Sequence, residues 1–132
     1  MDQSEAIIRE YIDACNEGDL ERAFAILDPA VEFHEAAALP GAISAVGSEQ
    51  VHRYLERFPT YWSRFHWEPL DIRVLGDRAL MRARLQLEGR SSGVKVDREW
   101  FYVFTVRDGK LLRQEGYDDI ASANTALEAE ST

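Results

Sequence analysis

Apolar residues in the first part of the chain recur at a helical period. From Asp2 to about Asn16 they are spaced three or four positions apart, which predicts an amphipathic helix with one buried side. Gly18 suits the left-handed conformation that ends many helices. Asp19 can cap a second, short helix, which must stop before Pro29 because proline disfavours helical geometry in the residue that precedes it.

A short strand and a third helix are expected next. Residues 31–35 alternate between apolar and polar, as a half-buried strand does. Ser48 can cap a helix after the loop that follows. Pro59 predicts that this helix ends or kinks near Phe58. The apolar side of the helix comprises Val51, Tyr54, Leu55, Phe58 and Trp62.

Strand patterns dominate the second half of the chain. Period-two alternation and turn signals such as Asp108-Gly109 predict strands at residues 70–74, 79–88, 94–106 and 110–117. Helices followed by meandering strands indicate an α+β fold, in which the N-terminal helices cover the apolar face of the sheet. We expect a single domain over residues 1–132, with about 119–132 as a loosely ordered tail, either a short helix or disordered.

Composition and charge limit the classes of binding partner that the protein is expected to have. The chain of 132 residues carries 15 Lys and Arg against 24 Asp and Glu, a net charge of −9, which argues against nucleic acid as a partner because phosphates demand clustered cations. It has no apolar run near the ~20 residues that cross a bilayer, so no membrane partner is expected. The single cysteine, Cys15, and an acidic N-terminus without a basic leader predict a cytoplasmic protein.

Several short motifs resemble those of one protein superfamily. Residues 16–20 resemble the turn between the first two helices of NTF2-like proteins, and residues 92–97, 104–110 and 116–118 resemble its bacterial SnoaL-like branch. The resemblance extends from about Ser4 to Asp119. It implies a cone in which helices and a curved mixed or antiparallel sheet enclose one pocket. The superfamily includes polyketide cyclases, ketosteroid isomerases and non-catalytic members, so the fold alone does not specify function.

The resemblance to ketosteroid isomerases implies two catalytic candidates. Tyr11 matches their oxyanion-binding tyrosine, and the position of their catalytic base falls on His34. The position of their protonated aspartate holds Trp100, so the oxyanion pair is incomplete. Glu35 follows His34, but on an ideal strand it shares the side of Phe33 and would need a bulge to act as the base. We therefore expect His34 as the acid/base and Tyr11 as the oxyanion donor.

Strand alternation and the third helix together predict an aromatic pocket for a small hydrophobic molecule. Its ligand-binding residues are expected to be Tyr54, Phe58, Trp62, Met81, Trp100, Tyr102 and Gln114. No cofactor is expected, because the glycines match no nucleotide-binding motif. Glu32 and His34 have the spacing for a shared metal ion, but no third ligand accompanies them, so no metal site is predicted.

Two functions remain open at this stage. An enzyme would use His34 and Tyr11 for the proton transfers of isomerisation, cyclisation or dehydration. A non-catalytic binding or dimerisation module would need only the aromatic pocket, with the tyrosines as core residues and His34 in a structural role.

The outer face of the sheet is expected to form a homodimer. The polar row of Arg82, Arg84 and Gln86 lies on the opposite face of its strand from the apolar row. The resemblance to the superfamily implies that this face packs on a second subunit. Trp67 and Tyr117 are the expected aromatic anchors of the contact.

Overall fold

The structure is a computed structural model that describes residues 2–35 and 44–129. Within them the chain forms four helices and a six-stranded mixed sheet that does not close into a barrel. The elements in chain order are α1 (Gln3–Glu17), α2 (Leu20–Ile26), β1 (Leu27–His34), β2 (Ser44–Val46), α3 (Ser48–Tyr61), β3 (Trp62–Leu75), β4 (Arg78–Gly89), β5 (Lys95–Arg107), β6 (Lys110–Tyr117) and α4 (Ile120–Glu128).

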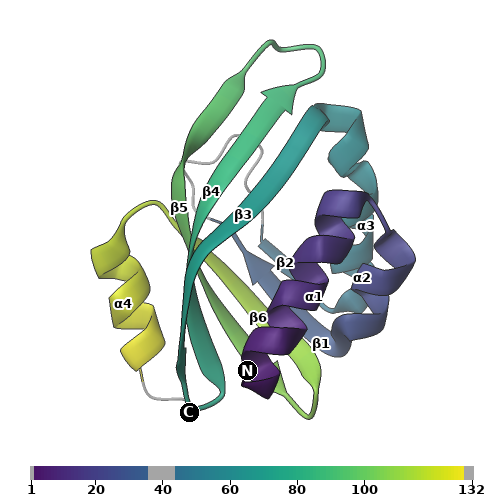
Figure 1. Cartoon of the computed structure of the whole chain (residues 1–132). Coiled ribbons are helices and arrows are strands. Elements are labelled where there is room, and N and C mark those ends of the chain that lie inside the picture. Colours follow the sequence, from purple (N-terminus) through teal and green to yellow (C-terminus); the bar gives the residue numbers. More distant parts are fainter. Residues whose placement is uncertain (1, 36–43, 130–132) are drawn as a thin grey trace.

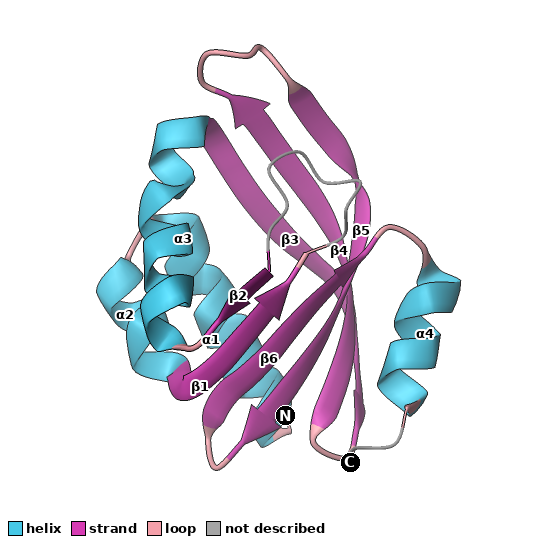
Figure 2. Cartoon of the chain, turned by 180° about the vertical axis from the view of Figure 1, so that it is seen from behind, coloured by secondary structure: helices cyan, strands magenta, loops and turns pink. Residues whose placement is uncertain are grey.

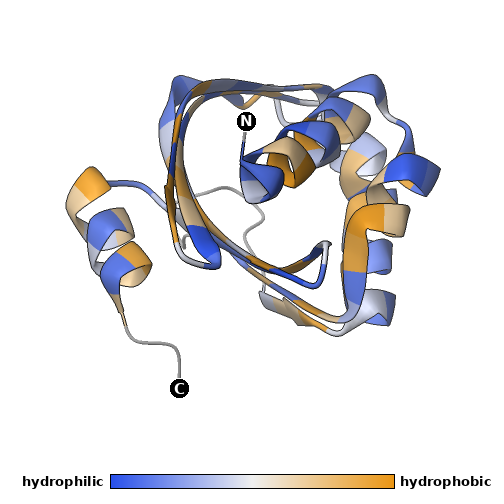
Figure 3. Cartoon of the chain, turned by 60° about the horizontal axis from the view of Figure 1, so that its bottom comes forward, coloured by the Kyte–Doolittle hydropathy of each residue, from blue (hydrophilic) through white to orange (hydrophobic). Residues whose placement is uncertain are grey.

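The sheet has the strand order β2-β1-β6-β5-β4-β3. All neighbours pair antiparallel except β1 and β6, which run parallel with Phe33 opposite Gln114. The strands curve around α1, with α2 and α3 at the same side (Figures 1 and 2). The view in Figure 3 shows α1 inside the curve and α4 outside it. The α+β fold with helices against a curved mixed sheet, predicted from the sequence, is confirmed.

Local signals set the helix ends where the sequence predicts them. The Asp2 carboxylate accepts a hydrogen bond from the Ser4 amide at 2.7 Å, and Gly18 ends α1 with a left-handed φ of 70°. The Asp19 carboxylate accepts from the Arg22 amide at 3.2 Å and begins α2. These caps satisfy backbone groups that a helix terminus otherwise leaves unpaired.

The third helix differs from its prediction at both ends. Its N-cap is Gly47 rather than Ser48, with no side-chain cap bond, and α3 continues through Pro59 to Tyr61. Proline near a helix C-terminus removes only one backbone bond, and the last carbonyls of α3 have a substitute donor. The Arg90 amide donates to Tyr61 O and the Arg90 Nε donates to Pro59 O, each at 2.9 Å. Arg90, from the turn after β4, therefore caps α3.

Most buried apolar side chains belong to one cluster between α1, α3 and the concave face. It includes the two rows expected to face inward, namely Met81, Ala83, Leu85, Trp100, Tyr102 and Phe104. A smaller cluster joins Leu80, Phe101 and Val103 to Ala123 and Leu127 of α4. The chain end thus forms a helix on the outer face, and β5 is buried on both sides.

The rest of the outer face is charged, and its charged side chains form ion pairs with one another. Arg84 makes a bidentate pair with Asp97, at 2.9 and 3.0 Å, and Arg82 pairs with Glu99. Trp67, one expected anchor of a dimer contact, is not on this face: it lies opposite Leu85 in the ladder and is 3% exposed, inside the main cluster. That anchor is wrong because the register of β3 pairs Trp67 with Leu85 of the inward-facing row, after a register shift between Trp62 and Arg64.

Candidate functional site

An interior cavity of about 340 Å³ lies between α1, α3 and the concave face of the sheet. Six of the predicted site residues line it: Tyr11, Tyr54, Phe58, Trp62, Tyr102 and Gln114. Met81 and Trp100 are buried in the same core but do not line the cavity. A mainly aromatic cavity with a few polar groups is the usual composition of a small-molecule site.

Edge-to-face contacts fix the aromatic rings around the cavity. Trp67 stands at the centre, with ring centroids 6.2 Å from Tyr11, 5.7 Å from Phe65 and 4.7 Å from Tyr102. Such T-shaped pairs each add about 0.5–1.5 kcal/mol beyond the area they bury. The cavity walls are therefore largely aromatic, apolar surfaces.

Two carboxyl groups line this cavity: that of Glu17, which is exposed and paired with Arg22, and that of Glu35. The Oε1 of Glu35 accepts a hydrogen bond from Gln114 Nε2 at 2.7 Å, and its Oε2 is buried without a partner in the described part of the chain. Burial raises the pKa of Glu35 to about 7, although the bond from Gln114 acts in the opposite direction. A carboxyl group with this pKa can both accept and donate a proton near neutral pH.

The tyrosines around Glu35 stay protonated. Burial, the nearby Cys15 and the charge of Glu35 raise the pKa of Tyr11 well above its usual value. Burial and Glu35 likewise raise the pKa of Tyr54 and of Tyr102. Their hydroxyls are thus available as hydrogen-bond donors, and the Cys15 thiol, whose pKa burial raises to about 12, stays neutral.

Three polar atoms of residues that line the cavity are buried and have no hydrogen-bond partner among the described residues. They are Glu35 Oε2, Gln114 Oε1 and Trp67 Nε1. Trp67 lies close enough to the Tyr102 hydroxyl to lower its pKa, but the two do not form a hydrogen bond of normal geometry. An unsatisfied buried polar atom costs about 1–3 kcal/mol, so a ligand that pairs with these atoms gains affinity.

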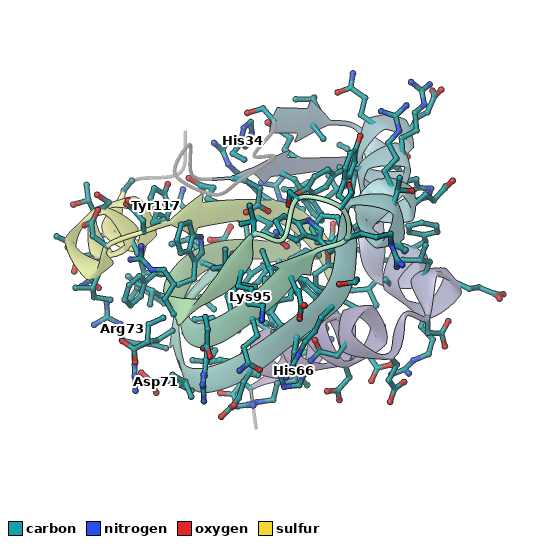
Figure 4. The ribbon with its side chains drawn as sticks, turned by 90° about the horizontal axis from the view of Figure 1, so that it is seen from above. His34, His66, Asp71, Arg73, Lys95 and Tyr117 are labelled. Atoms are coloured by element: carbon teal, nitrogen blue, oxygen red, sulfur yellow. The ribbon has the colours of Figure 1, made fainter. Side chains whose placement is uncertain are left out.

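His34 is not among the residues that line this cavity. Its Nε2 lies 3.0 Å from Glu32 Oε1 and its Nδ1 lies 3.2 Å from Ser44 Oγ, so both ring nitrogens are partnered at the surface. Figure 4 shows His34 at the β1–β2 edge of the sheet. The cause is strand alternation: Phe33 is fully buried toward the pocket, which turns His34 outward and brings Glu35 to the interior.

Phe65 and Trp67 also line the cavity, although the sequence pattern did not predict them as lining residues. Both lie in the first half of β3, which extends from Trp62, whereas the predicted strand begins at residue 70. Their spacing of two is a strand signal, but Pro69 interrupts the pattern. The register of β3 shifts between Pro69 and Asp71, which lets the strand continue past the proline.

The described ranges, 2–35 and 44–129, contain neither a metal-binding cluster nor a membrane-spanning helix. No group of three His, Cys, Asp or Glu side chains there is arranged to hold a metal ion. The two residues considered as metal ligands, Glu32 and His34, instead bond to each other. None of the described helices has the length and apolar character needed to cross a membrane.

Solved structures with this arrangement of helices and sheet define the class. An NTF2-like protein from Burkholderia pseudomallei covers 98% of this chain and 100% of its own, with a TM-score of 0.79 at 18% identity. The match to TerC, co-crystallised with polyporic acid, covers 97% of this chain and 100% of TerC, with a TM-score of 0.77 at 19% identity. The match to a putative polyketide cyclase from Sinorhizobium meliloti covers 89% of this chain and 100% of the cyclase, with a TM-score of 0.69 at 26% identity. The fold is that of the NTF2-like proteins.

The family within this class follows from the sequence. The SnoaL-like domain family matches residues 8–114, which extend from within α1 through β5 to most of β6. This chain belongs to the SnoaL-like family, as the sequence motifs indicate. No curated protein sequence matches the chain at a significant level.

Proposed function

We propose that this protein binds a small, largely apolar molecule with a carbonyl group in the interior cavity and transfers a proton on it, with Glu35 as the acid/base. The observation that carries the proposal is the buried Glu35 carboxyl, with one oxygen fixed by Gln114 and the other unpaired. The fold shared with a putative polyketide cyclase and with TerC, co-crystallised with polyporic acid, supports an aromatic, oxygen-bearing ligand. Perturbed carboxyl groups in clefts are frequent catalytic groups.

The proposed step is removal of a proton from a carbon next to the carbonyl. Glu35 Oε2 takes the proton, the electrons of the broken C–H bond form the enolate double bond, and the negative charge develops on the carbonyl oxygen. Tyr11, kept protonated by its surroundings, donates a hydrogen bond to that oxygen. Glu35 then returns the proton to another atom of the substrate, which completes an isomerisation or follows closure of a ring.

Apolar side chains hold the body of the substrate in this proposal. Tyr54, Phe58, Trp62 and Tyr102 line the cavity, and each Å² of apolar surface removed from water contributes roughly 25 cal/mol. Gln114 orients Glu35 by its hydrogen bond to Oε1. Met81 and Trp100 act from behind this wall as core residues.

The direct test is exchange of the acidic C–H protons of small cyclic ketones for deuterium, followed by NMR in D₂O. The wild type should accelerate exchange, Glu35→Gln should lower that rate by about 10²–10⁴-fold, and Tyr11→Phe should lower it less. His34→Ala is the matched control at the neighbouring position and should keep the wild-type rate. If Glu35→Gln keeps the rate and His34→Ala loses it, the acid/base assignment to Glu35 is wrong.

A homodimer and a cytoplasmic location are further parts of the proposal. The charged rows on β4 and β5 would meet their own copy across a two-fold axis, where Arg82 and Glu99 can exchange partners. A single cysteine supports a reducing compartment. Static light scattering at micromolar concentration should give twice the chain mass of 15.1 kDa, and a particle of 15.1 kDa would refute the dimer.

A further inference from the structure

A second cavity of about 590 Å³ opens beside the interior one. It lies over α3, β2 and the turn between β4 and β5, where Ser91 and Ser92 line it. Three aromatic residues of the α3 region, Tyr54, Phe58 and Trp62, line both cavities. The two cavities are therefore neighbours that share these three side chains.

The second cavity differs from the interior one in charge. Among the described residues its lining includes Arg53 and Arg57 and no Asp or Glu, although the whole chain has a net charge of −9. The two arginines are four residues apart on α3, so they project from the same side of the helix. Arg53 also pairs with Glu49, one turn earlier. We call this cavity, with Arg53 and Arg57 at its edge, the arginine groove.

Other side chains of the arginine groove are compatible with an anion. Ser44, Ser91 and Ser92 carry hydroxyl donors, and Gln50 an amide. The planar guanidinium group offers paired donors that match the two oxygens of a carboxylate.

We propose that the arginine groove binds a carboxylate group of the same ligand whose apolar body occupies the interior cavity, so that the ligand is an amphiphilic organic acid. This inference rests on ligand binding in the interior cavity as proposed above. Both arginines are exposed, so the carboxylate would keep part of its hydration while the rings are buried. The same arrangement keeps the ligand's negative charge away from Glu35, which would repel it in the interior. The carboxylate thereby fixes which end of the ligand faces Glu35.

The test compares two fluorescent probes with the same ring system and chain, pyrenebutanoic acid and pyrenebutanol. At low salt and pH 8 the wild type should bind the acid about 5- to 20-fold more tightly than the alcohol. This gain in affinity lies between the gain expected from an exposed ion pair and the gain expected from a hydrogen bond to a charged group. The Arg53→Gln/Arg57→Gln double variant should bind both probes equally, with its affinity for the alcohol unchanged. High salt should reduce the advantage of the acid in the wild type.

Arg64→Gln is the control for general electrostatics, because Arg64 lies on β3, is exposed and lines neither cavity. This variant should keep the full preference for the acid. Equal binding of acid and alcohol by the wild type, or an equal loss in Arg64→Gln, overturns the carboxylate site and leaves the interior pocket intact. Failure of both probes to bind overturns the pocket itself and the carboxylate site with it.

Discussion

Replacing Glu35 by Gln should stabilise the folded protein, and by an amount that grows with pH. The pKa of Glu35 is about 7 in the fold and 4.5 without its surroundings, a difference of about 2.5. At 1.36 kcal/mol per pKa unit, the buried carboxylate costs about 3 kcal/mol of folding free energy once both states are ionised. Between pH 4.5 and 7 the folded state binds more protons than the unfolded state, so wild-type stability falls as pH rises through this window.

Gln has the shape of Glu but no charge, so the variant lacks this pH-dependent cost. The difference in unfolding free energy between variant and wild type should therefore be near zero at pH 4.5 and about 3 kcal/mol at pH 8. Urea denaturation followed by circular dichroism, at a series of pH values, measures it directly. Glu56→Gln, at an exposed position of α3, is the control and should change little at either pH.

A stability difference that is constant with pH, or one that favours the wild type at pH 8, would refute this account of Glu35. The first outcome would mean that the Glu35 carboxyl is as well solvated as it is in the unfolded chain. The second would mean that the carboxylate has hydrogen bonds in the fold that offset its burial. Either result would also remove the physical basis for Glu35 as a base near neutral pH.

Three further predictions concern the pocket, the outer helix and pH. Tryptophan fluorescence should change when a polycyclic aromatic ketone is added, since Trp62 and Trp67 line the interior cavity, and a flat titration over a varied panel would count against a preformed site. Leu127→Ala should lower the free energy of unfolding by about 2–5 kcal/mol in urea titrations, because Leu127 packs on β5 and is only 2% exposed. A loss below about 0.5 kcal/mol would show that α4 does not pack on the sheet. If Glu35 is the base, the deuterium exchange rate should rise with pH and level off above about 7, and a rate that falls over this range would contradict that role.

Local signals in the sequence were sufficient for much of the fold. Asp2, Gly18 and Asp19 bound the first two helices through contacts with their immediate neighbours. The Asp108-Gly109 turn has positive φ at both positions, 52° and 75°, as a tight hairpin requires. These features depend on a few adjacent residues, which is why the sequence alone predicts them.

The candidate site depended on contacts that the sequence does not reveal. The alternation of residues 31–35 places apolar Phe33 inside, yet family position favoured His34, and a shift of one residue exchanges the two faces of a strand. An acidic residue such as Glu35 is normally solvated, so its burial depends on the aromatic shell that distant elements provide. The docking of α4 on β5 is a tertiary contact of the same kind.

The parallel pairing of β1 with β6 has a consequence for synthesis of the protein. It joins Glu35 to Gln114, residues separated by 79 positions in the chain, through one hydrogen bond. A nascent polypeptide leaves the ribosome from its N-terminus, so the helices and β1 emerge long before β6 is made. Until β6 is available, Glu35 lacks the hydrogen bond from Gln114. Glu35 therefore reaches its final surroundings only after β6 has inserted between β1 and β5.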